Sequence, residues 1–298
     1  MRSVVVLLLC VGCAKSDPLP AEDTDLPYDG PPQLSFLAVD NGAMKLVYVD
    51  EIGGGGWTTQ VPFNPRDIAR SGDDEVLVSH ELGAARVKLS TGEVTWTLDT
   101  QSGVTSARPL PNGHVLLGEQ DGGDVALVEV DDAGVEVSRV TAPGYDDLRL
   151  VRRLDDGHTL FTTSSGGHRV VEVDATGAEV WTAPLPGKGY VAERLANGDT
   201  LATTGDDKRL LELDASGAIV REWGGAVALP DAGLEWFSGF EVLDGDVAVC
   251  ANWFGHDTSL PGPHVVALDA DNQLVWSWAD RAAAVQVTNV LVLGSRGF

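Results

Sequence analysis

The chain has 298 residues and a formal net charge of −25, with 45 acidic residues against 20 basic ones. Phosphate backbones and anionic lipid surfaces are bound by cationic footprints, so this charge excludes nucleic acid as an expected partner and favours cations or basic partners. The length suffices for one repeat domain and leaves no room for a second.

Residues 1–12 have the pattern of an export signal. Arg2 precedes an apolar run, Val4 to Leu9, that is too short to span a bilayer. The run leads into Val11-Gly12-Cys13, which resembles the lipobox of bacterial lipoproteins, where a small residue directly precedes the cysteine that is lipidated. Cys10 stands where that pattern prefers leucine, and an ordinary cleaved secretory signal is the alternative.

Residues 13–33 are rich in proline and acidic side chains. Such a segment cannot bury enough apolar surface to fold, so we expect an extended tether between a lipid on Cys13 and the folded domain. By resemblance to lipoproteins of bacteria with two membranes, Ala14 implies anchoring to the outer membrane, on its periplasmic or surface face. Cys250 then remains as the single cysteine of the folded part, and we expect it to be a buried, unreactive thiol.

From about residue 64 to residue 279 one pattern recurs five times. A polar turn that ends in glycine leads into an apolar strand, and a second strand pair follows around an Asp-x-x-Gly turn. Apolar residues alternate along the strands, as at Val171 and Val173, which is the period of β-structure. The turn glycines are separated by 41, 44, 41 and 47 residues: Gly72, Gly113, Gly157, Gly198 and Gly245. This spacing, with four short strands in each repeat, is typical of a β-propeller blade.

Strand-like segments at both ends of the chain supply one more blade. They are residues 35–40, 45–50, 57–61 and 285–293. When strands from both termini share a blade, no open sheet edge remains. The sequence therefore predicts an all-β fold over residues 34–298, a six-bladed β-propeller of four-stranded blades, with seven blades as the alternative. We expect the tryptophans that close the second halves to pack between neighbouring blades: Trp96, Trp181, Trp223 and Trp276.

Ligand contacts are expected on one face of the propeller. The hairpin turns lie on one face, and the loops between second and third strands lie on the other, above the central channel, where ligands usually bind. The segment 251–264 is longer than its counterparts, which favours a binding role, and the long link 226–236 is expected beside it. We assign ligand or partner contacts to ten residues of this face: His80, Glu81, Arg149, His168, Tyr190, Trp236, Asn252, Trp253, His256 and His264.

No metal ligands are assigned. Beyond Cys13 the sequence contains neither a His-x-x-x-His nor a Cys-x-x-Cys motif. His114 and His158 follow turn glycines on the opposite face, where we expect structural roles. The acidic pairs Asp146-Asp147 and Asp206-Asp207 could hold a divalent cation such as calcium, but most such pairs in acidic proteins are solvated. The cofactor is therefore left open.

Two motifs resemble known families. The turn Asp174-Ala175-Thr176-Gly177 followed by Trp181 resembles the pyrroloquinoline-quinone-type propeller repeat, and together with LPNGHVLL (110–117) it resembles bacterial arylsulfotransferase-type propellers. The second resemblance implies a catalytic histidine near the start of an innermost strand. The corresponding stretches contain no histidine: 104–105, 148–149, 189–190 and 236–237. Quinone-dependent dehydrogenases have eight blades and longer chains, so neither sulfotransfer nor the quinone is expected.

We predict a non-catalytic cell-envelope lipoprotein whose propeller binds a protein, a glycan or a small ligand through its loop face. One alternative is a sulfotransferase-like, hydrolytic or lyase propeller enzyme that uses His80, His168 or His256 with Arg149. The other is an envelope assembly scaffold, similar to the propeller lipoprotein of the barrel-assembly machinery, that holds another envelope protein by its loops.

Overall fold

The computed structural model describes residues 28–100, 103–121, 123–255 and 257–298. The expected signal, Cys13 and most of the expected tether lie outside these residues, so lipidation and membrane location stay predictions. Residues 31–298 form one compact unit. The described part of the chain contains no helix with the length and apolarity needed to cross a bilayer.

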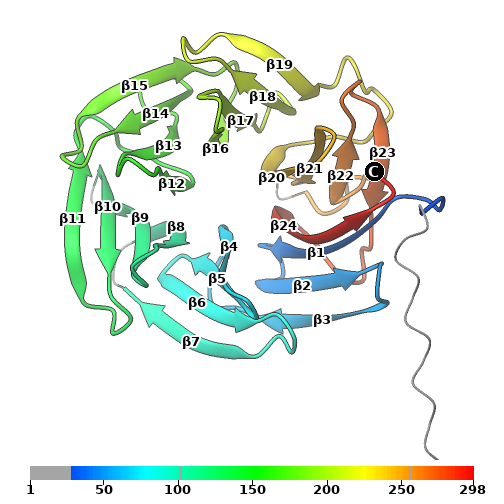
Figure 1. Cartoon of the computed structure of the whole chain (residues 1–298), viewed down its shortest axis with the longest axis horizontal. Helices are drawn as coiled ribbons and strands as arrows, with labels where there is room; N and C mark the ends of the chain where they lie inside the picture. The colour runs from blue at the N-terminus through cyan, green and yellow to red at the C-terminus, as the bar shows by residue number, and fades with distance from the viewer. Residues whose placement is uncertain (1–27, 101–102, 122, 256) are drawn as a thin grey trace, which may run out of the picture. The chain divides into compact units, whose positions relative to one another are not determined.

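Residues 31–298 form six four-stranded antiparallel sheets, arranged as the blades of a ring (Figure 1). The fold is a six-bladed β-propeller, as the repeat predicts. Blade 1 combines both ends of the domain, and its strands from the channel outward are β24 (Val287–Arg296), β1 (Gln33–Asp40), β2 (Lys45–Asp50) and β3 (Gly55–Gln60). The pairing of β24 with β1 runs from Asp40 opposite Val287 to Gln33 opposite Arg296 and closes the ring.

Blades 2 to 6 follow in chain order, each with its first strand innermost. Blade 2 is β4 (Ile68–Gly72), β5 (Glu75–His80), β6 (Gly83–Lys88) and β7 (Val94–Asp99). Blade 3 is β8 (Gly103–Pro109), β9 (Val115–Asp121), β10 (Asp124–Val130) and β11 (Glu136–Ala142). Blade 4 is β12 (Val151–Arg153), β13 (Thr159–Thr163), β14 (Arg169–Val173) and β15 (Glu179–Pro184). Blade 5 is β16 (Gly189–Arg194), β17 (Thr200–Thr204), β18 (Arg209–Leu213) and β19 (Ile219–Gly224). Blade 6 is β20 (Phe237–Leu243), β21 (Val247–Asn252), β22 (Val265–Leu268) and β23 (Leu274–Trp278).

The core lies between neighbouring blades, because the second strand of each blade has buried residues on both of its faces. All five residues of β17 are buried, and so are all six of β21. The hairpins between first and second strands turn as the sequence predicts: Gly113 and Gly198, each preceded by asparagine, have φ values of +88° and +94°. Glycine adopts this left-handed conformation without steric cost.

Tryptophans join adjacent blades, as expected. The indole N–H of each donates a hydrogen bond to an oxygen of the next blade, at 2.8 to 3.2 Å, from Trp57, Trp96, Trp181, Trp223 and Trp276. In blade 6 the acceptor is the carboxylate of Glu51 in blade 1, so this contact crosses the closure of the ring. A large apolar ring with one polar N–H suits such a position, because its bulk is buried while its donor is satisfied.

Candidate functional site

Irregular pairing shapes the loop-face mouth of the channel. In blade 5 the register between β16 and β17 shifts after Gly189 and resumes at Ala192, and in blade 6 it shifts between Phe237 and Phe240. A bulge re-aims the side chains within it. The bulged residues Tyr190 and Ser238 line a pocket of about 270 Å³ at this mouth.

The pocket contains four of the residues predicted from the sequence: Arg149, Tyr190, Trp236 and Trp253. Six further lining residues were not predicted: Asn41, Asn64, Arg66, Lys188, Ser238 and Thr288. Arg66 could have been found from the repeat, because its backbone N–H donates to Ser79 O as that of Arg149 donates to Thr162 O. The two arginines therefore hold the same position in blades 2 and 4. Lys188 and Asn41 lie in links between strands, where the repeat gives no signal.

The pocket is cationic although the chain is strongly acidic. Arg66, Arg149 and Lys188 contribute three positive charges, and no aspartate or glutamate is among the described residues that line it. Within the described part of the chain, neither the Arg66 nor the Arg149 guanidinium forms an ion pair. Positive charge focused in a concave site attracts anions.

Tyr190 places a neutral hydroxyl between these charges. Its side chain is 8% exposed. Burial raises the pKa of Tyr190 above the ordinary value, although Arg66 and Arg149 act in the opposite direction. The hydroxyl lies near Thr288 but forms no hydrogen bond of regular geometry with the described residues. A buried donor in this state is available to a ligand oxygen.

Two indoles form the aromatic wall of the pocket. The rings of Trp236 and Trp253 meet edge to face, with centroids 5.6 Å apart and planes at 89°. The backbone N–H of Trp253 donates to Trp236 O at 2.8 Å, and Lys188 Nζ lies 6.0 Å from the Trp236 ring centroid. The wall is therefore fixed by its backbone as well as by ring packing.

Asn252 does not line the pocket but supports this wall through hydrogen bonds to the loops that carry it. Its Oδ1 accepts the backbone N–H of Glu235 at 2.7 Å, and its Nδ2 donates to Gly233 O at 3.0 Å and to Pro263 O at 2.8 Å. These bonds tie the segment 251–264 to the link 226–236, which lies beside it as expected. Asn252 is fully buried, so its role in the structure is to position the two loops.

The described histidines do not meet at the channel. His80 and His264 are both fully buried outside the pocket, and burial lowers the pKa of each imidazole. His264 packs between Phe254 and Trp278, with ring centroids 5.2 and 5.5 Å away. Both histidines therefore serve the core and are neutral near physiological pH.

The remaining predicted contacts lie apart from the pocket lining. His168 is half-buried, and Glu81 is exposed and accepts a long hydrogen bond of 3.4 Å from Asn64 Nδ2, which places it at the rim. His256 lies outside the described residues.

The acidic pairs are engaged by the chain itself. Asp147 accepts hydrogen bonds from the Thr163 hydroxyl and from the backbone N–H groups of Ser164 and Ser165, at 2.6 to 2.9 Å. Asp206 accepts the backbone N–H of Lys188 at 2.7 Å. These carboxylates order the loops around the mouth, which accounts for their positions without a cation.

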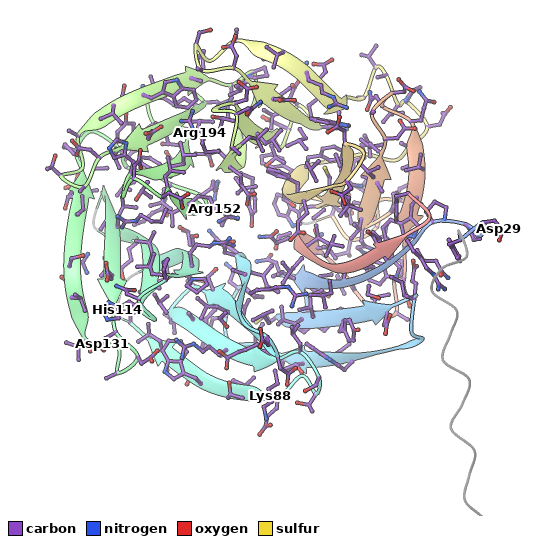
Figure 2. All side chains as sticks on the ribbon, in the orientation of Figure 1. Asp29, Lys88, His114, Asp131, Arg152 and Arg194 are labelled. Atoms are coloured by element: carbon purple, nitrogen blue, oxygen red, sulfur yellow. The ribbon has the colours of Figure 1, made fainter. Side chains whose placement is uncertain are left out.

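Asp156, His158 and Glu172 form a cluster on the hairpin face whose ligand atoms lie within 4.8 Å of one another. His158 Nδ1 is 2.7 Å from Glu172, whose other oxygen accepts from Arg194 Nη2 at 2.5 Å. Blade 3 repeats the pair, with His114 Nδ1 2.6 Å from Glu129; Figure 2 labels His114 and Arg194 on their blades. A pair that recurs at the same place in two blades belongs to the repeat, in agreement with the structural role expected for both histidines.

No family model matches the chain, and no curated protein matches it. Among solved structures, a protein of unknown function from Bacteroides caccae aligns with a TM-score of 0.73 and 21% identity over 86% of this chain and 97% of its own. Virginiamycin B lyase from Staphylococcus aureus aligns at 0.55, with 14% identity over 81% and 79% of the two chains. Regucalcin, a calcium-binding protein from Agrobacterium tumefaciens, aligns at 0.57, with 13% identity over 83% and 84%. At these identities the likeness establishes the fold, a β-propeller, and nothing of the activity.

Proposed function

We propose that this protein is an exported, lipid-anchored β-propeller that binds a small aromatic anion in the loop-face pocket without transforming it. The main support for this proposal is the set of residues that line the pocket. Three cations and no described acidic residue face it, in a chain whose net charge is −25.

The lining matches such a ligand group by group. The guanidiniums of Arg66 and Arg149 are suited to two-pronged hydrogen bonds with carboxylate or phosphate oxygens. The neutral Tyr190 hydroxyl adds a third donor, and the rings of Trp236 and Trp253 offer an aromatic wall. Each hydrogen bond to a charged group contributes roughly 1.5–3 kcal/mol, enough for binding in the micromolar to millimolar range.

The same groups are poorly suited to proton transfer near neutral pH. General acids and bases work best with a pKa near the operating pH. The pKa of Tyr190 is raised further from neutrality, and the described lining includes no histidine, cysteine or carboxylate. These features support binding over catalysis.

Calorimetry with simple probes tests the binding proposal. Phenyl phosphate and benzoate should bind to the purified protein, whereas benzylammonium, which has the same ring and the opposite charge, should not. Arg149→Gln should weaken phenyl phosphate binding about tenfold or more. Lys88→Gln, an exposed change on blade 2 (Figure 2), should leave it unchanged. Binding of benzylammonium as tight as that of phenyl phosphate would refute the proposal.

The anchor has its own test. It is supported by the sequence Val11-Gly12-Cys13 after an apolar run and by the acidic, proline-rich residues that follow. A chain expressed with radiolabelled palmitate should become labelled and fractionate with the outer membrane, and Cys13→Ser should abolish the label. Labelling that persists in Cys13→Ser would contradict lipidation at this residue.

A further inference from the structure

The other end of the channel, on the hairpin face, opens into a cavity of about 570 Å³. Residues of all six innermost strands line it. In four consecutive blades the side chain at the same register position is charged: Arg108, Arg152, Glu193 and Glu241. The same position is Ala69 in blade 2 and Leu291 in blade 1. Figure 2 shows Arg152 pointing toward the centre of the ring.

The order of the blades separates the charges across the cavity. Two arginines in blades 3 and 4 are followed by two glutamates in blades 5 and 6. Where the two signs meet, Arg152 Nε is 2.9 Å from Glu193 Oε1. Because six blades close the ring, Arg108 of blade 3 lies across the channel from Glu241 of blade 6. One wall of the cavity is therefore cationic and the opposite wall is anionic.

A buried ionic floor fixes the cationic wall. Asp67 is fully buried, 3.0 Å from Arg152 Nη1 and 3.7 Å from Arg108 Nη1, and it also accepts a hydrogen bond from the Ser106 hydroxyl. Arg108 Nη1 donates in addition to Ile68 O at 2.9 Å. Asp67 directly follows Arg66 of the loop-face pocket in the chain, so this floor separates the two mouths.

Of the two carboxylates in the described lining of the cavity, Glu193 pairs with Arg152 and Glu241 has no such partner. The backbone N–H of Val292 favours the ionised form of Glu241, but the carboxylate forms no ion pair with any residue in the described ranges. Burial, followed by the charge of Glu193, raises the pKa of Glu241 to about 7, although Arg108 and Arg70 act in the opposite direction. A cation placed beside Glu241 would remove this penalty.

We propose that the hairpin-face mouth is a second ligand site, for a small zwitterion whose carboxylate binds Arg108 and whose ammonium group binds Glu241. The small side chain of Ala69 leaves the space between them open. This site is separate from the aromatic-anion pocket, and neither proposal depends on the other.

A series of ω-amino acids measures the span between the two charges. Glycine, β-alanine, 4-aminobutyrate and 6-aminohexanoate should be titrated into the purified protein by calorimetry, with butyrate and butylammonium as singly charged controls. At least one zwitterion should bind about tenfold or more tightly than either control. Glu241→Gln should lower that affinity about tenfold or more, and Arg149→Gln at the opposite mouth should not change it. The proposal fails if no zwitterion binds up to about 50 mM, or if a singly charged control binds equally well.

A second variant tests the cavity without altering its charge. All five other blades carry a longer side chain at the position of Ala69, so Ala69→Leu is expected to fold. Ala69→Leu should fill the space and abolish zwitterion binding. This variant keeps the proposal testable if Glu241→Gln does not fold. Unchanged affinity in folded Ala69→Leu would overturn the proposal.

Proton release gives an independent signature. The ammonium group stabilises the ionised form of Glu241, so binding near neutral pH should expel a fraction of a proton. The calorimetric enthalpy should then depend on the ionisation enthalpy of the buffer, and this dependence should vanish in Glu241→Gln. A wild-type enthalpy that is the same in all buffers would contradict the role assigned to Glu241.

Discussion

The indole of Trp236 lies directly on Gly205, so that a β-carbon at position 205 would be 1.8 Å from Trp236 Cε2. Gly205 belongs to blade 5, whereas Trp236 precedes the first strand of blade 6. The aromatic wall of the loop-face pocket is therefore held in place by the absence of a side chain one blade away.

Gly205→Ala should displace the Trp236 ring and weaken binding of phenyl phosphate several-fold, because real Cβ contacts of this length do not occur and the indole must shift. Gly72→Ala is a matched control, since its β-carbon would meet the β-carbon of Glu75 at an ordinary 3.7 Å. Calorimetry and tryptophan fluorescence would report the two effects. Equal affinities in both variants would show that the Trp236 ring takes no part in binding.

Arg66→Gln and Arg149→Gln should each weaken phenyl phosphate binding by about 1–3 kcal/mol, because each removes a charge-assisted hydrogen bond. The wild-type affinity should fall as salt is added, and the double variant should show a much shallower dependence, since fewer charges attract the anion. Titrations at several salt concentrations check both effects. A salt dependence that is unchanged in the double variant would mean that the anion binds elsewhere.

Glu241 should make the stability of the propeller depend on pH. Its pKa is about 7 in the folded protein against an ordinary 4.5, so between these values the folded state binds more protons than the unfolded state. The free energy of unfolding contributed by this group therefore falls as the pH rises from about 5 to about 8. Glu241→Gln stays neutral and should be more stable than wild type at about pH 8, by on the order of 1–3 kcal/mol.

Urea denaturation at both pH values checks this prediction, with the exposed change Glu93→Gln as control. Near pH 5 wild type and Glu241→Gln should be nearly equal. If Glu241→Gln loses stability between the two pH values as much as wild type does, another group causes the dependence.

The tryptophan contacts between blades should contribute to stability and not to ligand binding. Trp223 is 2% exposed and donates to Asp246 O at 3.2 Å, so Trp223→Phe should destabilise the protein by about 1–3 kcal/mol through a lost hydrogen bond and a small cavity. Trp253→Phe, in the pocket, should reverse this pattern, with weaker phenyl phosphate binding and a smaller loss of stability. Urea denaturation and calorimetry on both variants would separate the two roles.

The repeat predicts the fold because every level of the sequence agrees. The glycine turns, the alternation of apolar residues and the terminal strands all indicate four-stranded blades closed across the termini, and the structure contains six of them. The tryptophans could be placed between blades because a large ring at the end of each repeat has no other apolar surface to cover.

The candidate sites were predicted only in part, for physical reasons. Arg149 and Tyr190 were found because they lie near the start of innermost strands. The length of the segment 251–264 did not show that Asn252 forms hydrogen bonds between two loops and does not line the pocket. The charged residues of the hairpin-face mouth open the regular repeats, from Arg108 to Glu241. They resemble ordinary exposed strand ends in sequence, and only closure of the ring brings them around one cavity.

The most direct measurement is a crystal structure of the protein grown with phenyl phosphate. The phosphate oxygens should lie within hydrogen-bond distance of the Arg66 and Arg149 guanidiniums, with the phenyl ring against Trp236 or Trp253. Phenyl phosphate bound outside the loop-face pocket, or an empty pocket at a saturating concentration, would contradict the binding proposal.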